Sequence, residues 1–213
     1  MATICPTVTV STPDEYASQI KRVEGFAERI HIDVADGDFA PTKLIAPERL
    51  YFPDHVRCDI HVMYERPETV RMTVISLRPH MIIFHAESEG NVFELMREVK
   101  AAGIKAGVAL LPETQPEEAK HLIEMADHAL IFGGHLGYQG GEADLSQLNK
   151  VIVIRAIKDD IEIGWDGGVN DQNAAQIVER GADVLNVGGY IQSSDNPQEQ
   201  YKKLQRALVA EPN

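Results

Sequence analysis

Apolar runs alternate with amphipathic stretches along the whole chain. The apolar runs are short and rich in β-branched residues, which is typical of buried strands. The stretches between them repeat apolar residues at helical spacing, as Tyr16, Ile20, Val23 and Phe26 do after a Ser-Thr-Pro-Asp helix start. We expect strands over 3–10, 29–34, 56–63, 80–84, 105–110, 129–132, 161–165 and 184–187.

Helices are predicted in most of the intervals between these strands. The first follows Pro13, a short one covers about 48–51, and another starts at Pro67. The remaining predicted helices cover about 91–102, 116–126, 145–158, 172–180 and 197–209. Alternating strands and helices fit either an open doubly wound sheet or a closed barrel.

Two further features favour a (β/α)8 TIM barrel over the open sheet. The pattern contains eight β-α units, and polar residues follow several strands rather than one glycine-rich fingerprint. Gly-x-Gly-x-x-Gly is missing after the first strand, which argues against a dinucleotide fold. Because no linker or shift in composition divides the chain, we expect a single α/β domain over residues 1–213.

Composition and charge exclude several classes of protein. With 44% hydrophobic and 25% charged residues, the chain is typical of globular rather than disordered proteins. A net charge of −13 argues against a nucleic-acid partner. No apolar run reaches the ~18 residues of a membrane span and no signal-peptide pattern is present, so we expect a cytoplasmic protein. Cys5 and Cys58 lie in apolar runs and are expected to be buried thiols.

Polar side chains at strand ends predict a metal site. His31 and Asp33 point to one face of the second strand, while His61 and Asp166 lie at the ends of the third and seventh. In a barrel these ends meet at one rim, where two imidazoles and two carboxylates would suit Zn²⁺, Fe²⁺, Mn²⁺ or Co²⁺. The alternative for the second strand is an ordinary edge strand with one solvated face.

Other histidines are less informative. His85 and Glu87 follow the fourth strand, where they either orient a metal-ligating imidazole or belong to a surface loop. The rest show no convergence with the predicted site and are expected to be surface or core residues: His55, His80, His121 and His128.

Glycine pairs predict a phosphate site. Gly167-Gly168 follows the seventh strand and Gly188-Gly189 the eighth, the two positions at which barrels often bind phosphate through backbone amides. A third glycine-rich stretch, 133–141, is predicted to close over the same rim as a lid, with an ordinary mobile loop as the alternative.

With these motifs in their order and spacing, the chain resembles the ribulose-phosphate 3-epimerase family nearly from end to end. The matching segments are 5–7, 31–41, 59–63, 66–68, 84–87, 107–110, 112–114, 166–169 and 181–184. The resemblance implies a TIM barrel, a phosphorylated ketose as substrate, and one divalent metal ion held by His31, Asp33, His61 and Asp166.

The resemblance also implies roles for individual residues. Asp33 and Asp166 would act as the two acid/base groups that invert carbon 3 of D-ribulose 5-phosphate through a cis-enediolate, giving D-xylulose 5-phosphate. Homo-oligomers are common in this family, so an assembly of identical subunits is expected. The residues implied to contact the substrate or its phosphate are Thr7, Met63, Gly140, Gly141, Gly167, Gly168, Gly188 and Gly189.

The chain departs from the family pattern at a few positions. Ala35 replaces a common methionine, Leu111 a usual asparagine and Gly189 a usual serine, and the loop 135–141 differs most. Every predicted metal and acid/base residue is retained, so these changes concern substrate identity rather than reaction type. They leave two alternatives open: a six-carbon ketose phosphate of the allulose 6-phosphate type, or a non-catalytic barrel that binds a sugar phosphate.

Overall fold

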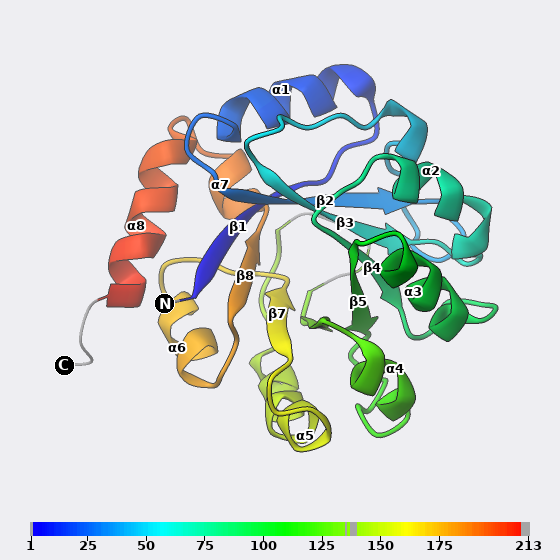
Figure 1. Ribbon diagram of the computed structural model, residues 1–213. Helices are drawn as coiled ribbons and strands as arrows, with labels where there is room; N and C mark the ends of the chain where they lie inside the picture. The colour runs from blue at the N-terminus through cyan, green and yellow to red at the C-terminus, as the bar shows by residue number, and fades with distance from the viewer. Residues whose placement is uncertain (1, 135, 137–139, 210–213) are drawn as a thin grey trace.

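The computed structural model is a closed barrel of eight parallel strands surrounded by helices (Figure 1). It describes residues 2–134, 136 and 140–209. Each strand pairs with the next in the chain, and β8 pairs with β1 to close the ring. The strands are β1 Thr3–Val8, β2 Arg29–Ala35, β3 Arg57–Met63, β4 Met81–His85, β5 Lys105–Leu110, β6 His128–Phe132, β7 Glu162–Asp166 and β8 Val184–Val187.

Helices cover the outside of this ring (Figure 1). Helix α1 begins at a capping box, in which the side chain of Thr12 accepts from the backbone N–H of Glu15 and the Glu15 carboxylate accepts from that of Thr12. No helix in the described part of the chain has the length and apolar character needed to cross a membrane. The helices are α1 Pro13–Val23, η1 Pro47–Arg49, η2 Pro67–Thr69, α2 Arg71–Ser76, α3 Val92–Ala101, α4 Lys120–Met125, η3 Leu145–Leu148, α5 Asn149–Ile157, α6 Ala174–Glu179, α7 Gly189–Gln192 and α8 Pro197–Val209.

The predicted barrel is confirmed, and the differences lie at element ends. The helix predicted over 116–126 begins only at Lys120, and the one over 145–158 starts with the 3-10 turn η3. The first strand ends at Val8, since its pairing with β2 ends with Val8 opposite Ile32. The short helix α7 was not predicted, because Gly188-Gly189 is a turn signal in sequence.

Alternation along the strands separates two environments. Ile30, Ile32 and Val34 of β2 belong to the main hydrophobic core, which also contains the apolar faces of the surrounding helices. Every residue of β2 is buried, and the strand pairs with both β1 and β3. The interpretation of this segment as an edge strand is therefore wrong: a closed barrel has no edge, and its polar face is the barrel interior.

An ionic network fills the amino-terminal end of the barrel interior. Arg29 is buried; its Nε lies 2.6 Å from Asp59 Oδ2 and its Nη2 lies 2.8 Å from Glu162 Oε2. His80 and His128 contact these carboxylates, each at 2.8 Å through Nδ1. Two of the histidines without a predicted role thus pair with acids, His80 with buried Asp59 and His128 with half-buried Glu162. The other two, His55 and His121, are exposed, and both cysteines are buried and free.

Candidate metal centre

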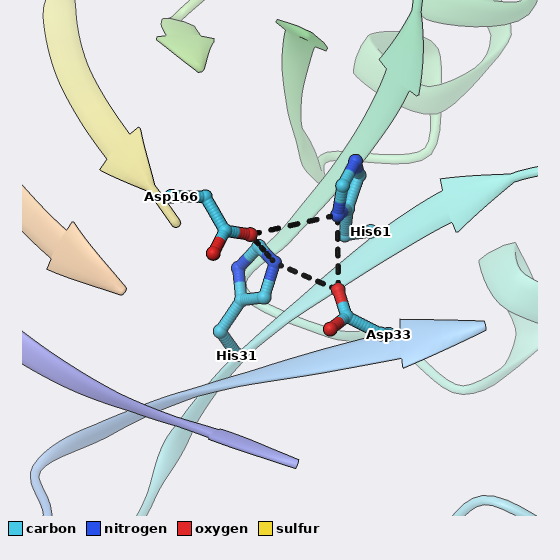
Figure 2. Close-up of side chains that lie close together, drawn as sticks. All are labelled: His31, Asp33, His61 and Asp166. Atoms are coloured by element: carbon cyan, nitrogen blue, oxygen red, sulfur yellow. Dashed lines mark hydrogen bonds and ion pairs between the residues drawn. The ribbon is translucent and has the colours of Figure 1, made fainter. Parts of the chain in front are cut away.

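Four side chains converge at the carboxyl-terminal end of the barrel (Figure 2). His31 and Asp33 come from β2, His61 from β3 and Asp166 from β7. Each contributes one potential ligand atom, and these atoms all lie within 4.8 Å of one another. Because Asp33 and His61 occupy paired positions of neighbouring strands, the alternation of β2 and β3 turns both side chains into the interior.

The geometry of this cluster fits a divalent cation. Asp33 Oδ1 lies 3.2 Å from His31 Nε2 and 3.0 Å from His61 Nδ1, and Asp166 Oδ2 lies 3.5 Å from His31 Nε2. Both ring nitrogens of His31 are buried without a hydrogen-bond partner among the described residues. A buried imidazole without a partner is costly, and a metal ion among these donors would satisfy it.

The two carboxyl groups of the cluster differ in proton affinity. Burial acts to raise the pKa of Asp33, but the close contacts and the charges of His31 and His61 outweigh it and hold that pKa well below its ordinary range. Burial and the negative charge of Asp33 instead raise the pKa of Asp166 to about 7. At neutral pH the metal-free site thus holds an ionised carboxylate beside a carboxyl group that is partly protonated.

A hydrogen-bonded series extends from His61 away from the cluster. His61 Nε2 lies 2.9 Å from His85 Nε2, and His85 Nδ1 lies 3.2 Å from Glu87 Oε2. Glu87 also accepts from the backbone N–H of Leu111 at 2.9 Å. His85 is fully buried, so the interpretation of this residue as part of a surface loop is wrong. Its contact orients the His61 imidazole with Nδ1 facing the cluster.

A cavity of about 240 Å³ opens beside the cluster and contains both carboxyl groups in its wall. It lies where the loops after β6, β7 and β8 meet. All residues that the resemblance assigns to substrate or phosphate line it: Thr7, Met63, Gly140, Gly141, Gly167, Gly168, Gly188 and Gly189.

The glycines at one end of the cavity allow backbones to approach closely. Gly167 and Gly168 have φ of +119° and +65°. A Cβ at Gly167 would lie 2.3 Å from the backbone nitrogen of Gly134, and one at Gly168 would lie 2.3 Å from that of Ala143. No Lys or Arg side chain is among the described residues that line the cavity. An anion at this end would therefore be bound by backbone amides, as expected for glycine-rich phosphate loops.

Only the ends of the predicted lid can be described. His135 and residues 137–139 lie outside the described residues, so closure of 133–141 over the site stays a prediction. On one side, Gly133 donates to the backbone oxygen of Asp166 at 2.8 Å. Leu136 packs against the buried cluster that contains Ala35 and Met63. At the other end of the segment, Gly140 and Gly141 line the cavity itself.

The sequence patterns did not reveal some polar residues of the cavity. Asn186 stands at an inward position of β8, and the hydroxyl of Thr9 donates to Asp33 Oδ2 at 2.6 Å. Asn170 and Tyr190 also line the cavity. The sequence signals for these residues were weak. Asn186 is one polar residue within the apolar run 184–187, and Thr9 lies in a β-branched run that was predicted to be strand as far as residue 10.

Comparison with known proteins gives consistent matches over the chain. The family model described as ribulose-phosphate 3 epimerase matches residues 3–192. Ribulose-phosphate 3-epimerase of Bacillus subtilis is 30% identical over 200 residues, covering 90% of this chain and 92% of that protein. The protein of the same name from Mycobacterium bovis is 28% identical over 214 residues, covering 97% and 93%.

Solved structures with low sequence identity share the fold. KGPDC from Streptococcus mutans superposes with a TM-score of 0.74 at 12% identity, covering 98% of both chains. The 3-hexulose-6-phosphate synthase of Salmonella typhimurium gives a TM-score of 0.69 at 14% identity, covering 97% of this chain and 98% of that one. At such identities the likeness supports the barrel architecture and nothing finer.

Proposed function

Because this chain belongs to the ribulose-phosphate 3-epimerase family, we propose that it interconverts D-ribulose 5-phosphate and D-xylulose 5-phosphate by inverting carbon 3. The observation that carries the proposal is the cluster of His31, Asp33, His61 and Asp166, whose two carboxyl groups line a cavity that glycine loops also line. It combines a candidate metal site and two carboxyl groups with room for a phosphate.

Inversion next to a ketone requires a proton to leave one face of the carbon and another to arrive on the opposite face. Asp33 comes from β2 and Asp166 from β7, with β8 and β1 between them in the ring. In one direction Asp33 takes the proton from carbon 3 while Asp166 delivers its own to the opposite face. In the reverse direction the two exchange roles. The low pKa of Asp33 and the raised pKa of Asp166 support this assignment.

The other residues of the site bind and orient the substrate. A divalent cation, when bound by the four ligands, would stabilise the negative charge that develops on the substrate oxygens. Backbone amides of Gly167, Gly168, Gly188 and Gly189 would bind the phosphate and so hold carbon 3 between the two carboxyl groups. Met63 and Thr7 also line the cavity.

A six-carbon ketose phosphate is the second candidate substrate. Ala35 packs with Met63 and Leu136 in the small apolar cluster beside the cavity. A methionine at position 35 would occupy more of this space, so the alanine favours a longer or differently shaped sugar. The same acid/base pair would act on either substrate. A barrel that only binds sugar phosphates is the further alternative.

Proton NMR in D₂O tests the proposal directly. Metal-loaded protein is mixed with D-ribulose 5-phosphate, and we expect loss of the carbon 3 proton signal together with formation of xylulose 5-phosphate. Asp166→Asn should abolish both while the protein stays folded. If exchange occurs only with allulose 6-phosphate, the six-carbon alternative is correct. If folded, metal-loaded protein exchanges neither sugar, the protein is not an epimerase of these ketose phosphates.

A further inference from the structure

One wall of the cavity is polar but belongs neither to the metal cluster nor to the glycine loops. Asn186 of β8 and Thr7 of β1 form this wall, and each is only 2% exposed. Asn186 Oδ1 and Thr7 Oγ1 are buried and have no hydrogen-bond partner in the described part of the structure. Buried polar atoms are almost always paired, so unpaired atoms that line a cavity indicate a polar ligand.

The position of Asn186 identifies which part of a ligand it meets. Asn186 lies beside Asp166 in the strand register, so its neighbour on one side carries a proposed acid/base group. Its neighbour on the other side is Cys5 of β1. Two residues further along the chain is Gly188, in the proposed phosphate loop. Asn186 therefore lies between the reacting centre and the phosphate end of the cavity.

We propose that Asn186 binds the substrate hydroxyl on the carbon between the epimerised carbon and the phosphate-bearing carbon, the 4-hydroxyl of a pentulose 5-phosphate. This inference rests on the proposed function, because the orientation of the sugar follows from it. The cation would take the oxygens on carbons 2 and 3, and the glycine loops take the phosphate. The 1-hydroxyl lies at the end of the sugar remote from the phosphate, which leaves the 4-hydroxyl opposite Asn186.

The chemistry of an amide suits this role. A hydroxyl both donates and accepts hydrogen bonds, and an asparagine side chain offers one acceptor and one donor group in the same plane. The amide is uncharged, so it adds no charge beside Asp166. The buried Asn186 Oδ1 has no partner without substrate, and it also has none when the bound sugar lacks the 4-hydroxyl. The free-energy cost of this unpaired oxygen means that Asn186 favours sugars that carry a hydroxyl at that carbon.

Thermal stability provides a test that is independent of turnover. Leucine has nearly the shape of asparagine without the polar atoms, so Asn186→Leu should raise the Tm of the metal-free protein. Asn173 serves as the matched control. Its amide is already satisfied, donating to Gly168 O at 2.9 Å and accepting from Asn170 N–H at 2.8 Å, so Asn173→Leu should lower the Tm. A lower Tm for Asn186→Leu would mean that the amide is structural, and would overturn the proposal.

Kinetics with a modified substrate identifies the hydroxyl. The wild-type protein should prefer D-ribulose 5-phosphate over its 4-deoxy analogue by about tenfold to a hundredfold in kcat/KM. In Asn186→Leu this preference should fall at least tenfold, mainly because the natural substrate loses its partner while the 4-deoxy sugar does not. Metal content, measured in the same samples, should be unchanged.

The outcomes separate this inference from the proposed function. If Asn186→Leu slows both sugars equally, Asn186 does not bind the 4-hydroxyl, although the epimerase function stands. If the wild-type protein turns over neither sugar, the proposed function fails. The inference is then decided by calorimetry with ribitol 5-phosphate and its 4-deoxy analogue: an Asn186-dependent preference for the hydroxylated ligand supports it, and equal affinities overturn it.

Discussion

The two oxygens of the Asp33 carboxylate have different surroundings. Oδ1 lies near His31 and His61, on the side where a cation would bind, whereas Oδ2 accepts from Thr9 at 2.6 Å. A carboxylate that ligates a cation and also exchanges a proton needs a defined rotation about its Cβ–Cγ bond. The Thr9 hydroxyl supplies that constraint from just beyond the end of β1.

Replacing Thr9 tests this orientation. Thr9→Val keeps the shape but removes the hydrogen bond, so we expect kcat to fall about tenfold with little change in KM. Thr9→Ser restores the hydroxyl and should recover most of the loss. Steady-state kinetics with D-ribulose 5-phosphate makes the measurement, and a serine variant as slow as the valine variant would show that the hydroxyl is not responsible.

His85 contacts His61 and is not among the described residues that line the cavity. Its contact at 2.9 Å orients the His61 ring, so His85→Gln should weaken binding of Mn²⁺ or Zn²⁺ about tenfold to a hundredfold. Competition with a chelator of known affinity provides the measurement. Exposed His121 is the matched control, and His121→Gln should leave the affinity unchanged. An unchanged affinity in His85→Gln would mean that the His61 ring is oriented by its surroundings alone.

At the scale of elements, the loop after β7 depends on close backbone packing. Gly168 has φ of +65°, and a side chain there would meet the backbone of Ala143 at 2.3 Å. The residues before η3 therefore set the position of the loop that is proposed to bind phosphate. Gly167 and Gly168 are therefore needed for the packing of this loop against the segments that contain Gly134 and Ala143, whether or not an anion binds there.

Gly168→Ala should therefore disturb both the fold and the site. We expect a loss of about 1 kcal/mol or more in the free energy of unfolding, together with a raised KM as the loop shifts. Gly103 has a similar φ of +78°, but a Cβ added there would meet no atom within 4 Å. Gly103→Ala should lose stability through φ alone and keep its KM. Denaturant unfolding and kinetics on both variants make the comparison, and an unchanged KM in Gly168→Ala would contradict it.

At the scale of the whole molecule, the barrel interior is polar at both ends and apolar between them. Met81, Ile83, Ala109 and Leu130 form a separate buried apolar cluster of inward-facing side chains. The amino-terminal end is filled by the network of Arg29, and the carboxyl-terminal end by the candidate metal site. The amino-terminal end thus holds an ionic network that is expected to stabilise the barrel, and the carboxyl-terminal end holds the candidate site. The homo-oligomer expected from the resemblance stays a prediction.

The Arg29 network makes stability depend on acidic pH. Burial acts to raise the pKa of Glu162, but His128 and Arg29 outweigh it and lower that pKa below its ordinary value. A carboxyl group whose pKa is lowered by folding stabilises the protein at pH values above its unfolded-state pKa of about 4.3. This stabilisation is lost as the pH falls toward the folded-state pKa. Glu162→Gln should cost about 2 kcal/mol at pH 7. This cost should shrink below about pH 4 in urea unfolding curves; a pH-independent difference would contradict the ionic origin.

Much of this molecule was predictable because local patterns and global topology agree. The eight strands, the inward direction of His31 and Asp33, and the position of the glycine pairs follow from alternation, helical spacing and turn chemistry. Positions at strand ends named the four candidate ligands, and the resemblance then implied that they hold one divalent metal ion. The expectations that failed concern features that a local pattern does not fix. Burial of β2 and of His85 depends on strands that are distant in the sequence, and helix α7 begins at a glycine pair that is a turn signal in the sequence.

The sequence by itself determined the order of elements, the barrel class and which side chains face inward, because these depend on periodicities of two and 3.6 residues. Beyond the four candidate metal ligands, only the tertiary structure decided which inward-facing residues meet. Thr9 reaches Asp33, His85 reaches His61 and Asn186 lies beside Asp166 because the register of neighbouring strands sets their height in the barrel. Strand register depends on how two strands that are distant in the sequence pair, so the sequence of a single strand does not determine it.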